Sequence, residues 1–360
     1  MGEARDVPIK IRRISIKNYK GVDSLDLEIP APLMLDDPDI LVMGSKNGLG
    51  KTSVIECCAL LLLAHTIPEK RIRLNDRYSA IDVPDLLIKA GSDYAEIEGE
   101  VVFETDAATL QMRIDRRGNV RIYGESLSES LIDSGRFDLE RDSDQIVKAI
   151  CGFSPNPVID SLFLLFHSYR KIQEGNPELG MMVQDRARRR SHRYDMRTEF
   201  PVSAFKVRIL RSLMAQADLF ELEEESESRE ANEKLNELVE LYVGGTIGKL
   251  RSSSDNTVDL RISLGNGEKS FTFDGLSSGQ KEIISTLFLI WYHTKNKPSV
   301  VFIDEPELHL NAQWHRSFAD SLLSLAPQNQ YIIATHSEDV MGSVDEDRRI
   351  LLSDDYGPGE

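Results

Sequence analysis

The chain has 360 residues, a formal net charge of −17, and a composition that is 41% hydrophobic and 29% charged. This length suits two compact lobes or one large α/β domain with an insertion. The acidic balance argues against nonspecific nucleic-acid binding by the whole surface, and no apolar run approaches the roughly 20 residues of a membrane helix. The polar N-terminus and the three cysteines indicate neither a secretory signal nor a disulfide framework. We therefore expect a cytoplasmic protein without a membrane partner.

The first half of the chain predicts strands around one Gly-rich loop. Apolar patterning predicts strands over 9–16, 25–29 and 39–43, a buried helix over 52–63, short antiparallel strands between 95 and 123, and a buried run over 158–166. Arg117-Gly118-Asn119 is a candidate hairpin turn within the antiparallel region. This half of the chain therefore predicts an antiparallel β lobe beside the Gly-rich loop that follows the strand over 39–43.

The second half alternates helices and strands. The expected elements are helices over 202–219 and 225–241, strands over 258–264 and 270–273, a helix over 279–293, a strand over 300–303, a helix over 313–325 and a strand over 331–334. The final alternation implies a parallel sheet with crossover helices. The predicted fold class is α/β, with a parallel core sheet, an antiparallel β lobe and a helical insertion lobe, and the predicted segments are 1–175, 176–257 and 258–360.

A basic segment lies between residues 186 and 197. One interpretation is a solvated segment without a partner. The other is a contact to a phosphate backbone or to an acidic protein, although aromatic residues that would stack on bases are sparse there. Both interpretations stay open.

A candidate phosphate loop follows the strand over 39–43. Phosphate binding needs glycines that let backbone N–H groups curl around the β-phosphate, a lysine that reaches the β/γ oxygens and a hydroxyl that holds Mg²⁺. Lys51 and Thr52 fit the last two roles, and the glycine that usually opens the loop stands one position early, at Gly44. The predicted nucleotide-binding residues are Ser45, Lys46, Asn47, Gly48, Leu49, Gly50, Lys51, Thr52 and Ser53.

Two further groups of polar residues follow buried strands. Asp304 and Glu305 end the strand over 300–303, at the place where α/β folds bind ligands. Asp304 is expected to hold Mg²⁺, and Glu305 to accept a proton from an attacking water. His336 follows the strand over 331–334, where it can hydrogen-bond a γ-phosphate and orient water.

A short Ser-Gly segment opens the helix over 279–293. Its residues Ser277, Ser278, Gly279 and Gln280 place a hydroxyl and backbone N–H groups at a helix start, which makes an anion site. Alone, such a segment is more often a helix cap. Its position after the phosphate loop and before the Asp-Glu strand favours a nucleotide contact.

The order of phosphate loop, Ser-Gly segment, Asp-Glu strand and strand-end histidine resembles ABC-type ATPases. The opening Ile14-Ser15-Ile16-Lys17-Asn18-Tyr19-Lys20-Gly21-Val22 is similar to the SMC/RecF/Rad50 branch, and Asp304-Glu305-Pro306-Glu307-Leu308-His309-Leu310 to its AAA_15/AAA_21 group. The resemblance implies a homodimer with two ATPs, each held by Lys51, Thr52, Asp304, Glu305 and His336 of one chain and by Ser277 and Gly279 of the other. It also makes Gln173 a candidate Mg²⁺ ligand.

Four functions fit this resemblance. The favoured one is an ATP-gated dimer that senses nucleic acid or phage infection and regulates a separately encoded effector, a nuclease or toxin, since a stand-alone ATPase of this kind resembles those of anti-phage systems. The alternative is a RecF-like DNA repair ATPase that acts directly on DNA. A transporter subunit is disfavoured by the opening motif and the Asp-Glu-Pro-Glu-Leu-His run, and a structural role for ATP predicts binding without turnover.

Overall fold

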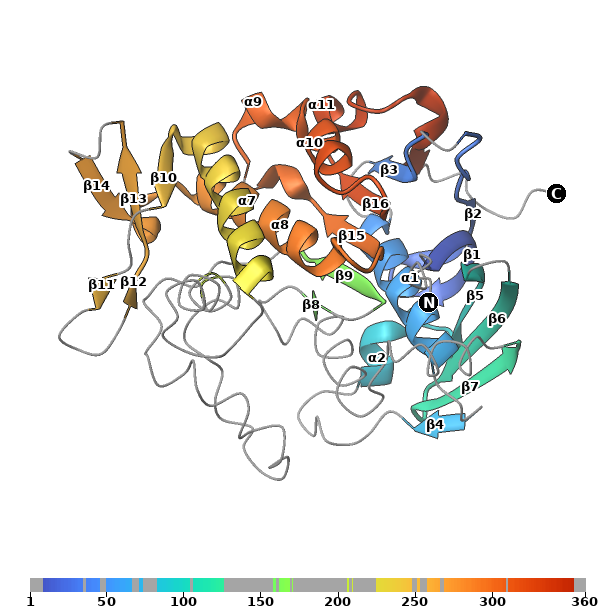
Figure 1. Cartoon of the computed structure of the whole chain (residues 1–360). Helices are drawn as coiled ribbons and strands as arrows, with labels where there is room; N and C mark the ends of the chain where they lie inside the picture. The colour runs from blue at the N-terminus through green and yellow to red at the C-terminus, as the bar shows by residue number, and fades with distance from the viewer. Residues whose placement is uncertain are drawn as a thin grey trace, which may run out of the picture. The chain divides into compact units, whose positions relative to one another are not determined.

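The structure is a computed structural model of the chain (Figure 1). It describes residues 9–34, 37–45, 50–66, 71–73, 83–103, 106–125, 158–159, 162–168, 170, 206, 209, 225–247, 251–252, 258–265, 269–308 and 310–352. The chain divides into two compact units. The first joins Met1–Arg170 to His293–Glu360, and the second is Lys171–Tyr292.

An antiparallel sheet forms one layer of the first unit. In the order β2-β1-β5-β6-β7-β4, its described strands are β2 (Val22–Glu28), β1 (Ile9–Tyr19), β5 (Tyr94–Phe103), β6 (Asp106–Asp115), β7 (Asn119–Gly124) and β4 (Arg71–Arg73). Buried and partly exposed residues alternate along β5, so one face of the sheet is apolar. Gly118, with φ of 75°, lies in the tight turn between β6 and β7, which confirms the predicted hairpin.

A mostly parallel sheet forms the second layer of this unit. In the order β17-β3-β16-β15-β9-β8, its described strands are β17 (Arg349–Leu352), β3 (Ile40–Ser45), β16 (Gln330–Thr335), β15 (Val300–Asp304), β9 (Phe163–Phe166) and β8 (Val158–Ile159). All neighbours are parallel except β8, which runs antiparallel to β9. Every residue of β9, β15 and β16 is buried, as expected of parallel strands covered on both faces.

Helix α1 (Lys51–Thr66) packs against both sheets (Figure 1). Residues 53–65 are all buried, because one side of the helix faces β1, β5 and β6 and another faces β3, β15 and β16. Gly99 in β5 permits the close approach, since a Cβ there would lie 2.3 Å from Leu61 Cδ2 and 2.6 Å from the carbonyl oxygen of Arg13. The helix that begins at the phosphate loop is thus fixed between two sheets.

Shorter helices complete the described part of the first unit. They are α2 (Val83–Leu87), α9 (Ala312–His315), α10 (Phe318–Leu325), α11 (Glu338–Met341) and the 3-10 helices Pro306–Leu308 and Glu346–Arg348. Helix α11 contacts β3, which precedes the phosphate loop. None of the helices in the described ranges has the length and apolar character needed to cross a membrane.

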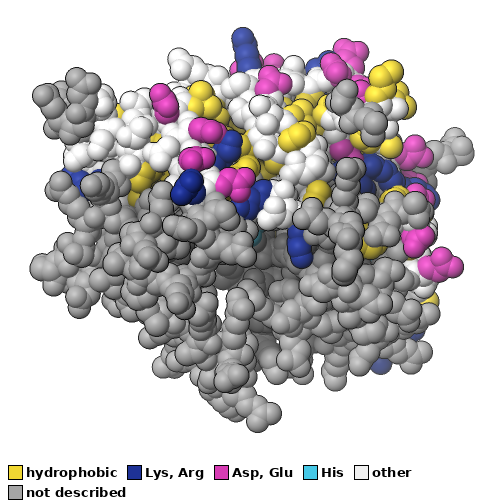
Figure 2. All heavy atoms as spheres, viewed as in Figure 1, with side chains coloured by type: hydrophobic (Ala, Val, Ile, Leu, Met, Phe, Trp, Pro, Cys, Tyr) yellow, Lys and Arg dark blue, Asp and Glu magenta, His cyan; other side chains and the backbone are white. Residues whose placement is uncertain are grey.

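The second unit holds two long helices and short antiparallel strands. Its described elements are α7 (Glu225–Val243), β10 (Gly245–Ile247), β11 (Arg251–Ser252), β12 (Val258–Asp259), β13 (Arg261–Leu264), β14 (Lys269–Thr272), the 3-10 helix Phe273–Gly275 and α8 (Ser278–Thr294). The pairings β10–β13, β13–β14 and β11–β12 are antiparallel. On the face drawn in Figure 2, the described acidic and basic side chains are interspersed.

The architecture confirms the predicted α/β class with a parallel core sheet and an antiparallel sheet. Two predicted elements are wrong in extent. The strand expected over 258–264 is divided into β12 and β13, which pair with different partners. The helix expected over 313–325 is divided into α9 and α10, where the Ser317 hydroxyl bonds back to the Trp314 carbonyl and competes with the helical backbone.

One strand was not predicted, and two predictions remain untested. Strand β17 pairs with β3 and was not expected. The helix over 202–219 lies outside the described residues except for Lys206 and Ile209. The division into 1–175, 176–257 and 258–360 stays a prediction.

A buried ion-pair network joins the two sheets of the first unit. Asp39, 4% exposed, accepts from the Arg12 guanidinium at 3.1 and 2.8 Å and pairs with Lys10 Nζ at 3.1 Å. Gln330, which opens β16, donates to Asp39 at 3.1 Å and exchanges hydrogen bonds of 2.8 and 2.9 Å with the backbone of Ile11. Burial opposes the charged form of Asp39, but the hydrogen bonds from Arg12 and the charge of Lys10 outweigh it, so the pKa of Asp39 is lowered.

We expect Asp39→Asn to lower the free energy of unfolding by about 2–4 kcal/mol in urea titrations, because it leaves two partly buried cations without their buried counter-charge. The control is Asp26→Asn, which removes a similar Arg pair on an exposed surface and should cost about 0.5 kcal/mol or less. Because the folded pKa of Asp39 is lowered, its stabilisation exists above the unfolded pKa of about 3.9 and is lost as pH falls through the folded value. Equal costs for the two variants would contradict this account.

Candidate functional site

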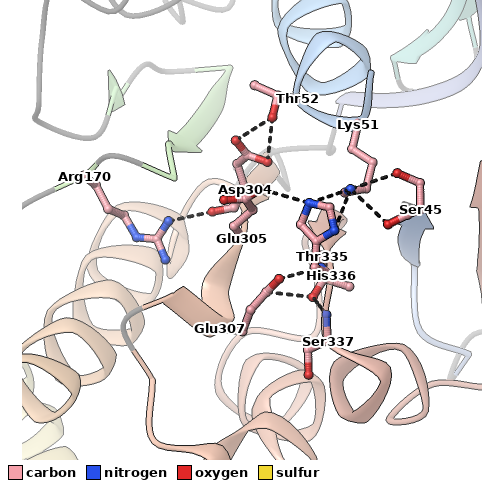
Figure 3. Close-up of polar contacts among 10 residues, drawn as sticks. All are labelled: Ser45, Lys51, Thr52, Arg170, Asp304, Glu305, Glu307, Thr335, His336 and Ser337. Carbon is pink, nitrogen blue, oxygen red and sulfur yellow. Dashed lines mark hydrogen bonds and ion pairs between the residues drawn. The ribbon is translucent and has the colours of Figure 1, made fainter. Parts of the chain in front are cut away.

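The parallel register brings polar residues together at the carboxyl edge of the core sheet. Asp304 pairs with Ala334 at the ends of β15 and β16, and Thr335 pairs with Gly44 in β3, one residue before Ser45. Helix α1 begins at the same edge, directly after the loop that follows β3. The edge therefore gathers Ser45, Lys51, Thr52, Asp304, Glu305 and His336 (Figure 3).

Lys51 lies at the centre of one group of contacts. Its Nζ donates to the Ser45 hydroxyl at 2.8 Å and lies 2.9 Å from His336 Nε2 and 3.3 Å from His336 Nδ1. The residue is only 5% exposed, and burial lowers the pKa of Lys51 although nearby carboxylates oppose this shift. A partly buried ammonium held at the start of a helix is suited to an anionic group such as phosphate.

Thr52 and Asp304 form the second group. The Thr52 hydroxyl lies 2.9 Å from Asp304 Oδ2 and 3.2 Å from Oδ1. Asp304 is 2% exposed, and burial, with the charge of Glu305 adding to it, raises the pKa of Asp304 to about 6 against the hydrogen bond from Thr52. A hydroxyl and a carboxylate that meet in this way are oxygen ligands of the kind Mg²⁺ prefers, so the donor set fits that ion.

Glu305 adopts a backbone conformation that is rare for a residue with a side chain. Its φ is 47°, which costs roughly 1–2 kcal/mol outside glycine. Its Oε1 lies 3.2 Å from His336 Nε2, the same nitrogen that lies 2.9 Å from Lys51 Nζ. Nε2 can donate to Glu305 only when it carries a proton and can accept from Lys51 only when it does not. The two contacts to His336 therefore compete.

Glu307 fixes the turn that carries His336. Its carboxylate accepts from the Thr335 hydroxyl at 2.7 Å and from the His336 backbone N–H at 2.5 Å. The Thr335 hydroxyl in turn accepts from the Ser337 backbone N–H at 3.0 Å. Sequence reasoning missed this role of Glu307. The available signals were a second carboxylate after the Asp-Glu pair and hydroxyl residues on both sides of the histidine.

The turn between β1 and β2 packs against the phosphate loop. Gly50 has φ of 85°, and a Cβ there would lie 2.4 Å from Val22 Cγ2, so glycine is required. Glu56, one turn into α1, accepts from Lys20 Nζ at 2.6 Å and from the Tyr19 hydroxyl at 3.1 Å. Burial raises the pKa of Glu56 against these hydrogen bonds. The motif at 14–22 thus supports the phosphate-loop helix from outside the loop.

The Ser-Gly segment lies in the second unit, at the start of α8. Ser277 and Gln280 form a reciprocal helix cap: the Gln280 backbone N–H donates to Ser277 Oγ at 3.2 Å, and the Ser277 N–H donates to Gln280 Oε1 at 3.2 Å. Ser277 and Ser278 are exposed, whereas Gly279 is buried. The segment therefore forms a helix cap, the simpler of the two interpretations. A nucleotide contact from the exposed serines is a separate proposal.

Several predicted site residues lie outside the described residues. They are Lys46, Asn47, Gly48 and Leu49 of the phosphate loop, Gln173, and the basic segment between 186 and 197. The predicted Ser53 is buried in the first turn of α1.

These features define a class. A strand, a loop and a helix that begins with Lys-Thr, beside an Asp-Glu pair on the next-but-one parallel strand, form the core of a phosphate-loop ATPase. Residues 46–341 match the family AAA_21, described as "AAA domain, putative AbiEii toxin, Type IV TA system". The chain belongs to this family, and it is an SMC/RecF-like ATPase of the ABC type.

Known proteins agree with this assignment. The DNA replication and repair protein RecF of Staphylococcus aureus (strain JH9) is 27% identical over 110 residues, which are 31% of this chain and 25% of RecF. The match thus spans about a quarter of the curated relative. An SMC head bound to the C-winged helix domain of ScpA aligns with a TM-score of 0.51 and 15% identity over 93% of this chain and 92% of that one.

A second solved structure shows the same fold. It is the SMC head domain with an extended coiled coil, bound to the C-terminal domain of ScpA, from Pyrococcus furiosus. It aligns with a TM-score of 0.52 and 13% identity, over 94% of this chain and 92% of that chain. At this identity the likeness describes the fold alone.

We expect Asp304→Asn to stabilise the protein in the absence of nucleotide and Mg²⁺. The folded pKa of about 6 exceeds the ordinary value of 3.8 for an aspartate, so ionised Asp304 costs stability at pH 8, on the order of 1–3 kcal/mol. The gain should appear in urea unfolding at pH 8 and disappear below about pH 4, where the carboxyl is protonated in both states. The sign is opposite to that of Asp39→Asn, and a loss of stability at pH 8 would contradict the account.

Proposed function

We propose that the chain binds and hydrolyses ATP with the site at the carboxyl edge of its core sheet. The observation that carries the proposal is the meeting of Lys51, the Thr52–Asp304 pair and the Glu305–His336 pair at one edge. Family membership supports the same conclusion.

In this proposal each side chain has a distinct task. Lys51 exchanges its contact with His336 for the β- and γ-phosphate oxygens, as its partly buried ammonium permits. Thr52 and Asp304 would hold Mg²⁺, which would supply positive charge beside the phosphates. Once Lys51 has moved to phosphate, His336 Nε2 is free of the competing contact. Glu305 then accepts a proton from the attacking water, and His336 orients that water.

We also propose that two chains close on two ATPs, with Ser277 and Gly279 of each chain contacting the ATP of the other. Support comes from the position of Ser277 and Ser278, which are exposed at the N-terminus of the 17-residue helix α8, a place that favours anions. A homodimer of this kind would be cytoplasmic, where ATP is available.

We propose a role in antiviral defence, in which nucleotide state reports infection or foreign nucleic acid to a separately encoded effector, a nuclease or toxin. The family description supports a paired system, because it names a toxin and a toxin–antitoxin system. The alternative, direct action on DNA in repair, has as its support the local similarity to RecF. DNA that stimulates turnover by the purified chain alone would select the alternative.

Replacing Glu305 with Gln should preserve ATP binding and trap the dimer, because the proton acceptor is lost while the shape is kept. The expected loss in kcat is about 100-fold or more, and light scattering should report a dimer in ATP and Mg²⁺. Asp320→Asn, an exposed acidic change on α10, is the matched control and should behave as wild type. A Glu305→Gln variant that stays monomeric in saturating ATP would exclude the sandwiched dimer.

Two changes at Ser277 separate the helix cap from the nucleotide contact. Both Asn and Asp keep a capping oxygen, so thermal stability should change little. Ser277→Asp also places a negative charge where we expect the partner's phosphates, so it should abolish ATP-dependent dimerisation and turnover. Ser277→Asn should retain dimerisation and some turnover. ATP binding by the monomer should persist in both. Weaker binding by the monomer would indicate that Ser277 acts on the ATP of its own chain.

A further inference from the structure

Strand β15 continues beyond the end of its neighbour β9. Their pairing ends where Ile303 meets Phe166, so the carbonyl of Asp304 points past the last residue of β9. The side chain of Arg170 takes the place of the missing strand donor. Its Nη1 donates to the Asp304 carbonyl at 2.8 Å and to the His167 carbonyl at 2.6 Å. Arg170 is only 4% exposed, so this guanidinium is built into the core.

The other end of the same peptide group is also held. The Glu305 backbone N–H donates to the Ala334 carbonyl of β16 at 2.8 Å. The plane of the Asp304–Glu305 peptide is therefore fixed by Arg170 on one side and by β16 on the other. This is the peptide that precedes the left-handed Glu305, with φ of 47°. Strained conformations of this kind persist when surrounding contacts determine them.

We propose that Arg170 is a positioning residue for hydrolysis. It holds the Asp304–Glu305 peptide in the orientation that directs the Glu305 carboxylate toward His336, and so toward the attacking water. Figure 3 shows Arg170 and His336 on opposite sides of the Asp304–Glu305 pair. The inference rests on the proposed ATPase function, and it adds a residue that touches neither ATP nor metal in that proposal.

A second route by which Arg170 could act is its charge. The guanidinium favours the ionised form of the Asp304 carboxyl, so a loss of charge would weaken Mg²⁺ binding. Its hydrogen bond, however, goes to the backbone carbonyl of Asp304. Action through the peptide lowers kcat and leaves the Mg²⁺ requirement unchanged, whereas action through the charge raises the Mg²⁺ concentration needed for half-maximal rate. The two routes therefore differ in a measurable way.

The test uses the full chain with Arg170→Met, Arg170→Lys and the control Arg348→Met. Arg348 is also 4% exposed and donates to a backbone carbonyl, that of Pro30, at 3.2 Å, in a part of the first unit without a proposed nucleotide contact. The measurements are kcat for ATP, the affinity for a non-hydrolysable ATP analogue, the Mg²⁺ concentration at half-maximal rate, and the melting temperature.

We expect Arg170→Met to lower kcat about 10- to 100-fold, as a misplacement of about 1 Å at a reacting group does. Analogue affinity and the Mg²⁺ midpoint should stay within about two-fold of wild type. Lysine keeps the charge but reaches about one bond less far, so Arg170→Lys should have an intermediate kcat with an unchanged Mg²⁺ midpoint. Arg348→Met should change only the melting temperature. If Arg170→Met does not fold, the same criteria apply to Arg170→Lys.

Two results would overturn the inference alone. One is an unchanged kcat in folded Arg170 variants of an active wild-type enzyme. The other is a loss of kcat matched by an equal shift in analogue affinity or in the Mg²⁺ midpoint. A wild-type chain that binds ATP without hydrolysing it would instead overturn the proposed function, and the inference with it.

Discussion

Parallel pairing of β3, β16 and β15 is the constraint on which the rest of the site depends. Three buried strands in this register end at one edge, where helix α1 also begins, so Thr52 and Asp304 meet although they are 252 positions apart in the sequence. Helix α1 starts at that edge and is held between two sheets, which fixes Lys51 and Thr52 relative to Asp304. The proposed chemistry therefore depends on the packing of largely apolar strands, which place functional side chains such as Asp304 at their carboxyl ends.

The same packing raises the free energy of the charged side chains at the site. Asp304 and Lys51 are nearly buried, and their pKa values shift toward the uncharged forms. In the proposed function, a nucleotide with its metal ion would supply the opposite charges, so its binding would offset the cost of burying Asp304 and Lys51. In the proposed mechanism, the competition of Lys51 and Glu305 for His336 Nε2 links phosphate binding to catalysis, because a phosphate that draws Lys51 away would change the hydrogen bonding of His336 beside Glu305. The charges of Asp304 and Lys51 thus lower stability but are needed for the proposed function.

The sequence predicted the parts of this site that follow from strand ends and motif spacing. Lys51, Thr52, Asp304, Glu305 and His336 each come directly after a buried strand or open a helix, and the structure brings them together. It did not predict the contact of Arg170 with the Asp304 carbonyl or the left-handed Glu305, because both depend on where β9 stops beside β15. Strand β17 was missed because a four-residue edge strand carries little periodicity. The break between α9 and α10 came from a serine that bonds back to its own helix.

The central claim is that each ATP site is shared by two chains, and one mixing experiment tests it most directly. Lys51→Met removes the phosphate-binding lysine, and Ser277→Asp blocks the contact to the partner's ATP, so neither variant should hydrolyse ATP alone. In a mixed dimer one site carries both lesions and the other carries neither. Because neither variant should close into an active dimer with itself, mixing equal amounts should restore turnover through the mixed dimer, to about half of the wild-type rate at most. A mixture that stays as inactive as its components would contradict the shared site.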